Sequence, residues 1–180
     1  MGNPLSSLTG GGTNPAMDLP DPDTGLTPRE KTAVRRIWDI VKADTKQNGV
    51  DLLVMFFEVN PSYQRHFKSF KDVPLKDLPR NSKFQAHCTS VMYALTSIVD
   101  NLDDTGCLVE MLTKLGQNHH RHGISRQEFI DLKTTVLKLL KKKLGSKFTT
   151  EDEAAWNKTL DVAYSVIFKG LDKSQGSGSK

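Results

Sequence analysis

Apolar residues recur at helical spacing early in the chain. An apolar side chain stands at every third or fourth position from Val34 to Val41, which is typical of the buried face of an amphipathic helix. Thr27, Pro28 and Glu30 precede this stripe in the order of an N-cap, a first-turn proline and a capping-box glutamate. The pattern predicts a helix that begins after Thr27.

A second apolar run predicts a helix from about Val50 to Val59. This helix should end at Asn60, because a residue that precedes proline is biased away from the helical conformation. Between Pro61 and Pro79 further prolines interrupt the pattern. We expect an irregular segment there, with one short helical turn after Pro61.

The rest of the chain has no proline after Pro79, so nothing forbids long helices in it. Four apolar stripes follow: Phe84 to Leu102, Leu108 to His119, Phe129 to Leu140 and Trp156 to Leu171. The caps expected for three of them are Ser82 with Gln85, Ser125 with Glu128 and Thr150 with Glu153. Gly123 and Gly145 are placed to end two of the helices. No segment alternates like a strand, so we predict an all-α domain of seven or eight helices.

The two ends of the chain differ from its middle in composition. Residues 1–25 are rich in proline and glycine, carry three aspartates and lack lysine and arginine. Such a segment buries too little apolar surface to fold alone. We therefore expect a disordered leader over residues 1–25, a folded domain over 26–172 and a flexible polar tail over 173–180.

Charge, cysteine content and hydropathy exclude several classes of protein. No apolar run approaches the ~18 residues of a spanning helix, and no signal peptide is recognisable, which favours a cytoplasmic protein. The net charge of +4 is modest and the lysines are dispersed, which argues against nucleic acid as a partner. Cys88 and Cys107 are too few for a disulfide framework and are expected to be free thiols.

Two histidines lie on otherwise apolar stripes. His87 stands between Phe84 and Val91, and His119 follows Leu115 by four residues, so both rings should point inward. A single inward histidine is more often a core residue with a hydrogen-bond partner. Two neutral imidazoles on different helices need a shared partner, and iron is the best-matched one.

Several motifs resemble the globin family when taken together. Trp38, ADTKQNGVDLL, Pro61 with Phe67 six residues later, HCTSV, LGQNHHRHG and Trp156 occur in the order and at the spacing found in globins. The resemblance covers nearly all of residues 26–171. It implies the globin fold around a haem b (iron protoporphyrin IX) pocket.

The resemblance also implies a role for individual residues. His119 would be the proximal ligand of the haem iron, and His87 the distal histidine and second iron ligand. Phe67 would stack on the porphyrin. Other pocket residues would be Leu53 and Val91 on the distal side and Leu115, Ile124 and Phe129 on the proximal side.

The implied function is reversible binding of oxygen, carbon monoxide and nitric oxide. HCTSVMYAL, VDNLDD and LVEMLTKLGQNHHRHG resemble the cytoglobin and globin X branch more than storage myoglobins, and a bis-histidine, hexacoordinate resting state is usual in that branch. The alternative is a haem redox enzyme or sensor at the membrane: a nitrite reductase, a nitric oxide dioxygenase or a protector against lipid oxidation. The chain has no glycine-rich dinucleotide motif, so such chemistry requires an external reductase.

The first six residues match an N-myristoylation pattern. Gly2 follows the initiating methionine and Ser6 stands at the required position. A single myristoyl chain gives marginal, reversible membrane binding. The sequence thus predicts lipidation at Gly2 and peripheral attachment to the inner face of the plasma membrane, with a soluble cytosolic protein as the alternative.

Overall fold

The computed structural model describes residues 14–173, which form helices and no strand. In this part of the chain the six α-helices are α1 (Pro28–Lys42), α2 (Thr45–Val59), α3 (Ser82–Asp100), α4 (Thr105–Arg121), α5 (Arg126–Leu144) and α6 (Thr150–Lys173). Four 3₁₀ helices join them: η1 (Pro15–Asp18), η2 (Pro61–His66), η3 (Leu75–Arg80) and η4 (Gly145–Lys147). The predicted all-α class is confirmed.

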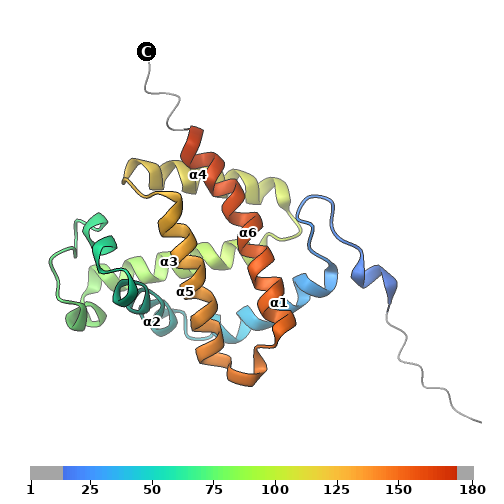
Figure 1. The fold of residues 1–180 in the computed structure, drawn as a ribbon, viewed down its shortest axis with the longest axis horizontal. Helices are drawn as coiled ribbons and strands as arrows, with labels where there is room; N and C mark the ends of the chain where they lie inside the picture. Colours follow the sequence, from blue (N-terminus) through green and yellow to red (C-terminus); the bar gives the residue numbers. More distant parts are fainter. Residues whose placement is uncertain (1–13, 174–180) are drawn as a thin grey trace, which may run out of the picture.

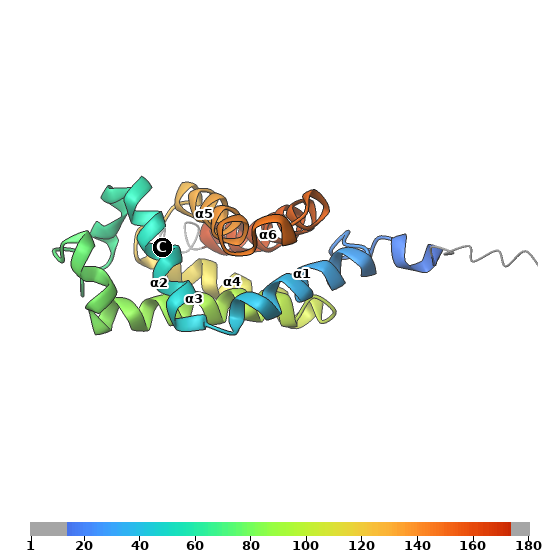
Figure 2. The same ribbon diagram turned by 90° about the horizontal axis from the view of Figure 1, so that it is seen from below.

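The helices are arranged in crossing layers. Figure 1 shows α5 and α6 side by side and crossing α1 and α3, and Figure 2 shows the two pairs on opposite sides of the molecule. Between the layers the rings of Trp38 and Trp156 contact each other, with centroids 5.5 Å apart, and both are almost fully buried. Trp38 Nε1 also donates a hydrogen bond to Thr96 Oγ1 over 3.0 Å. The two tryptophans therefore join the layer of α1 and α3 to α6.

Helix α4 lies unusually close to α6 because glycines meet at their contact. A Cβ atom added at Gly116 would overlap the backbone carbonyl oxygen of Ile167, and one added at Gly170 would overlap that of Thr113. Only residues without a side chain allow the two backbones to approach this far. The position of α4, and of every side chain that it carries, depends on this contact.

Two of the predicted helix starts are confirmed. Thr27 with Glu30 and Ser125 with Glu128 both form reciprocal capping boxes. Gly145 follows α5 with a positive φ of 54°, as its predicted place at a helix end requires.

Three predicted helix starts are wrong by one to five residues. α2 begins at Thr45 and not near Val50, because its first turn is polar and is capped by Asp44, which accepts a bond from Gln47 N. α3 is capped by Asn81 and not by Ser82: the Asn81 side chain accepts bonds from two backbone N–H groups.

The start of α6 is also shifted. Thr149 and Asp152, not Thr150 and Glu153, exchange the two capping bonds, at 3.2 and 3.0 Å. Several polar residues in a row offer alternative caps there, and periodicity alone does not choose among them.

The described part of the predicted leader is attached to the body. The buried Lys31 Nζ donates to the carboxylates of Asp21, over 3.0 Å, and Asp103, over 2.9 Å. Asp18 pairs with Arg29 in the same region. Residues 14–25 lie beside the start of α1, at the end of the molecule away from α2 (Figure 1), so the prediction of a free leader up to residue 25 is too long.

The predicted lipidation site, Gly2, lies outside the described residues. Within residues 14–173, no helix combines the length and the apolar character needed to cross a bilayer.

The close contact of α4 and α6 yields a stability prediction. Gly116→Ala should destabilise the fold by about 3 kcal/mol, because the methyl group meets backbone and not a flexible side chain. Gly106→Ala in the same helix is the control, since its Cβ would meet nothing closer than 3.8 Å and alanine favours the helix. Urea unfolding followed by circular dichroism measures both, and equal stability of the two variants would contradict the contact.

Candidate functional site

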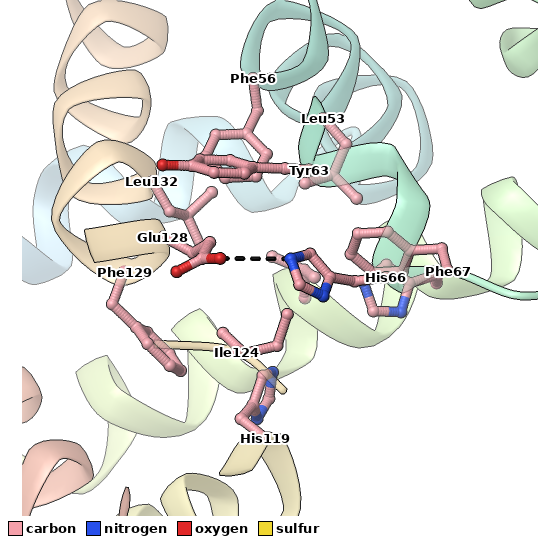
Figure 3. Close-up of a pocket in the computed structure, with 12 residues that line it drawn as sticks. Leu53, Phe56, Tyr63, His66, Phe67, His119, Ile124, Glu128, Phe129 and Leu132 are labelled. Atoms are coloured by element: carbon pink, nitrogen blue, oxygen red, sulfur yellow. Dashed lines mark ion pairs between the residues drawn. The ribbon is translucent and has the colours of Figure 1, made fainter. Parts of the chain in front are cut away.

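A cluster of buried apolar side chains that includes Leu53, Phe56 and Phe84 borders an apolar cavity between α2, η2, α3, α4 and α5. The empty space in this cavity, counted together with its opening to solvent, is about 460 Å³. Two adjoining cavities, of about 940 and 1140 Å³ on the same measure, share His87 and His119 with it. Figure 3 shows that its walls come from segments far apart in the sequence. The two histidines therefore lie where all three cavities meet.

His119 is held by its own helix. Its Nδ1 lies 2.8 Å from the backbone carbonyl oxygen of Leu115, and since a carbonyl oxygen only accepts, Nδ1 carries the hydrogen. In the neutral ring Nε2 then keeps a free lone pair. The edge of the ring packs on Phe129, with centroids 5.1 Å apart. Burial lowers the pKa of His119 and outweighs the opposite effect of the Leu115 bond, so the ring is neutral at pH 7.

His87 faces the same cavity from α3. Its ring packs against Phe67, with centroids 4.8 Å apart, and lies 6.2 Å from that of Phe70. Burial, together with the nearby His119, lowers the pKa of His87 to about 4. This ring is therefore neutral as well, which is the state that binds a metal.

These two imidazoles fit haem better than an isolated metal ion. Within residues 14–173 no three His, Cys, Asp or Glu side chains come together to hold a metal. Two imidazoles alone leave most coordination positions of a metal open, and a porphyrin supplies four nitrogen ligands in one plane. The apolar walls match the faces of such a ring, and the donor set suits haem iron.

All eight residues predicted for the pocket line these adjoining cavities. Seven surround the 460 Å³ cavity: Leu53, Phe67, His87, Val91, His119, Ile124 and Phe129. Leu115 lines the 1140 Å³ cavity. The structure brings the predicted set together, and their roles toward haem stay predictions.

Five further residues complete the wall of the 460 Å³ cavity and were not predicted for it: Phe56, Tyr63, His66, Glu128 and Leu132. Phe56 and Leu132 belong to apolar helix faces, and that pattern alone could have indicated them. Tyr63 and His66 lie on η2, which is too short to show a periodic face. The sequence assigns Glu128 to the capping box of α5, and nothing in that pattern indicates that its carboxylate also faces the cavity.

Two polar links join η2 to α5 beside the cavity. Tyr63 donates a hydrogen bond to Asp131 Oδ2 over 2.7 Å, and this bond raises the pKa of Tyr63 to about 12. His66 Nε2 lies 3.2 Å from Glu128 Oε1. Figure 3 shows the second pair reaching across the cavity between Tyr63 and Ile124.

The 940 Å³ cavity forms a polar mouth. Its polar lining consists of His66, Lys68, Ser69, Asn118 and His122 beside the two inward histidines. The carboxylates of a haem would find cationic and hydrogen-bonding partners at this edge.

The cysteines do not contribute to the cavity. Cys88 is fully buried, and burial raises the pKa of its thiol to about 12, so it stays protonated. Cys107 is exposed on α4. Both are free thiols, as predicted.

Comparison with known proteins gives a consistent result. The family model described as Globin matches residues 50–167. The Globin-2 B chain of Anadara inaequivalvis is 32% identical over 77% of this chain and 90% of its own length. Cytoglobin-2 of Danio rerio is 28% identical over 82% of each chain. A solved structure of the hexacoordinate haemoglobin of Drosophila melanogaster superimposes with a TM-score of 0.75 at 28% identity, over 80% of this chain and 94% of that one.

The geometry of His119 predicts which of two neighbouring histidines retains haem. His119→Ala should abolish stable haem retention, because it removes the Nε2 atom that Leu115 leaves free. His120→Ala should retain haem, since His120 lines a different cavity beside Arg126 and Leu171. Pyridine haemochrome titration after gel filtration measures haem per chain, and equal haem loss in both variants would refute the assignment of His119.

Proposed function

The chain belongs to the globin family and is a haem-binding protein; from this membership we propose that it holds haem b and reversibly binds oxygen, carbon monoxide and nitric oxide. The observation that carries the proposal is the pair of neutral imidazoles, on α3 and α4, that face one apolar cavity.

His119 is the proximal ligand in this proposal. The hydrogen bond from its Nδ1 to Leu115 orients the ring and leaves Nε2 as the metal-binding atom. Such a bond also raises the basicity of the ligand and fixes its orientation. Phe129 packs on the ring and limits its rotation.

The apolar walls exclude water. Bound haem supplies an iron coordination position at which a diatomic gas binds. Leu53, Phe67 and Val91 cover the cavity around His87 with apolar surface, which keeps out the water and anions that promote iron oxidation. His87 offers one N–H group toward a polar ligand.

We propose that His87 is the sixth iron ligand in the resting protein. Its neutral state and its place in the same cavities as His119 support this. The Drosophila haemoglobin that this chain resembles is described as hexacoordinate. External gases would then compete with His87 for the iron.

A second candidate function is haem redox chemistry: nitrite reduction, nitric oxide dioxygenation or protection of lipids from oxidation, with electrons from an external reductase. The observation that favours it is the ionisable His66–Glu128 pair in the cavity wall.

We further propose that Gly2 is myristoylated and attaches part of the protein to the inner face of the plasma membrane. Gly2 and Ser6 support this proposal. A single acyl chain makes the attachment reversible, so the rest of the protein would be cytosolic.

The coordination proposal predicts the effect of removing His87. His87→Leu should convert a low-spin deoxygenated ferrous spectrum to a five-coordinate, high-spin one. Carbon monoxide should then bind about 10–100-fold faster, because the competing side chain occupies the iron for about 90–99% of the time in the parent protein. Stopped-flow spectroscopy measures both properties. A high-spin spectrum in the parent protein would refute hexacoordination and leave haem binding intact.

The lipidation proposal predicts the effect of Gly2→Ala. In eukaryotic cells the parent protein should divide between membrane and cytosol, and Gly2→Ala should move it wholly to the cytosol. Cell fractionation measures this division. Ser7→Ala, which lies outside the required positions, is the control. A parent protein whose intact mass lacks the myristoyl group would contradict the proposal.

A further inference from the structure

His66 is a third histidine at the candidate haem site, and no iron ligation is assigned to it. It lines both the apolar 460 Å³ cavity and the polar mouth. Phe67, His87, His119 and Ile124 also border both spaces. Of these, the two other histidines have their proposed role at the iron, so His66 is the ionisable group left to connect the mouth with the interior.

Glu128 faces His66, whose buried Nε2 has no hydrogen-bond partner among the described residues. The Nε2–Oε1 distance is 3.2 Å, and the two side chains are 13% and 12% exposed. Glu128 Oε2 accepts a hydrogen bond from the backbone N of Ser125 over 3.1 Å, and another from the Ser125 hydroxyl. Burial acts to raise the pKa of Glu128, but the Ser125 bonds and the nearby His66 outweigh it and lower the pKa. An anchored carboxylate therefore faces a histidine ring in the cavity wall.

The pair is not needed to join η2 to α5. The hydrogen bond between Tyr63 and Asp131, at 2.7 Å, already links the same two elements. Burying an ionisable pair costs free energy. If the second contact served only to pack η2 against α5, apolar side chains would stabilise it more.

Other titratable groups lie on the elements that border these two cavities. They are Tyr63 and Arg65 on η2, Glu128 and Asp131 on α5, His87 on α3, His119 and His122 near the end of α4, and Lys68 at the mouth. Among them Glu128 is the group that an ion pair joins to His66. A carboxylate in this position orients an imidazole and supports its protonated form.

We propose that the His66–Glu128 pair donates protons from the mouth to a small oxyanion that is reduced in the cavity. The inference rests on the redox candidate of the proposed function. Nitrite represents the substrate class: nitrite, two protons and one electron give nitric oxide and water. One N–O bond breaks, and its oxygen leaves as water with both protons. A ferrous haem held beside His119 would supply the electron, and the external reductase would return it.

In this scheme the protons that come from the mouth pass through the His66 imidazolium. The ring gives up a proton toward the cavity and regains one from solvent at the mouth. Glu128 does not transfer protons itself; it positions the ring and stabilises its charge.

The test uses the haem-loaded protein with His87→Leu as the parent, because this removes the distal histidine as another proton donor. Anaerobic nitrite reduction and carbon monoxide binding are followed by stopped-flow spectroscopy from about pH 5.5 to about pH 8. Adding His66→Phe should slow nitrite reduction at least about 10-fold at low pH, and flatten its pH dependence. Carbon monoxide needs no proton, so its binding rate should change less than about 2-fold.

Three matched variants separate proton donation from packing. Glu128→Gln should weaken the pH dependence, and Glu128→Asp should restore part of it. Tyr63→Phe removes the other link between η2 and α5 and should keep the pH dependence. The haem midpoint potential is a second measurement, and it does not involve nitrite. Its dependence on pH should be smaller in His66→Phe than in the parent.

The outcomes distinguish this role from the function on which it rests. A parent that binds carbon monoxide and forms no nitric oxide would overturn the redox function and this role with it. Normal nitric oxide formation and an unchanged pH profile in His66→Phe would overturn the role of the pair alone. Equal slowing of nitrite reduction and carbon monoxide binding would also overturn it, because that result indicates altered access.

Discussion

The structure depends on the requirement that two uncharged imidazoles, His87 and His119, face one apolar cavity. A polar nitrogen in apolar surroundings is costly unless it has a partner. His119 satisfies one nitrogen through Leu115. In the proposed coordination, a metal inside a flat, apolar macrocycle would be the partner of both rings at once. That requirement explains why the walls around the histidines are aromatic and aliphatic, and why burial keeps both rings neutral.

Helix contacts away from the cavity position the two histidines. The backbones of α4 and α6 approach closely at Gly116 and Gly170, and His119 follows Gly116 by less than one helical turn. The tryptophan contact joins α6 to α1, and α1 packs on α3, which carries His87. The two helices that carry His87 and His119 are thus positioned through the same helix, α6. A loss of packing at the glycine or tryptophan contacts should therefore displace the two histidines.

Much of the fold and part of the site could be predicted from the sequence. The apolar stripes identified the helices because burial of one helix face is encoded by local spacing. The starts of α2, α3 and α6 were missed because polar first turns offer several competing caps. The attachment of residues 14–25 was missed because it depends on Lys31 meeting Asp103, 72 residues away in the sequence. His66 and Glu128 were missed for a similar reason: a charged pair between η2 and α5 leaves no periodic signal in either segment.

In the proposed coordination, exchange between His87 and an external ligand requires movement either of the α3 backbone or of the His87 side chain. A Cβ atom added at Gly49 would lie 2.9 Å from the backbone oxygen of Cys88 and from Met92 Cγ, so α2 and α3 are in close contact one residue beyond His87. Packed cores shift between discrete arrangements more readily than they deform, and this contact leaves the backbone at His87 little room to slide. Rotation of the His87 side chain is then the cheaper movement, and the Phe67 and Phe70 rings against which it packs set its barrier. In the proposed coordination, the aromatic segment after η2 would therefore control the rate of ligand exchange, and the α3 backbone would not.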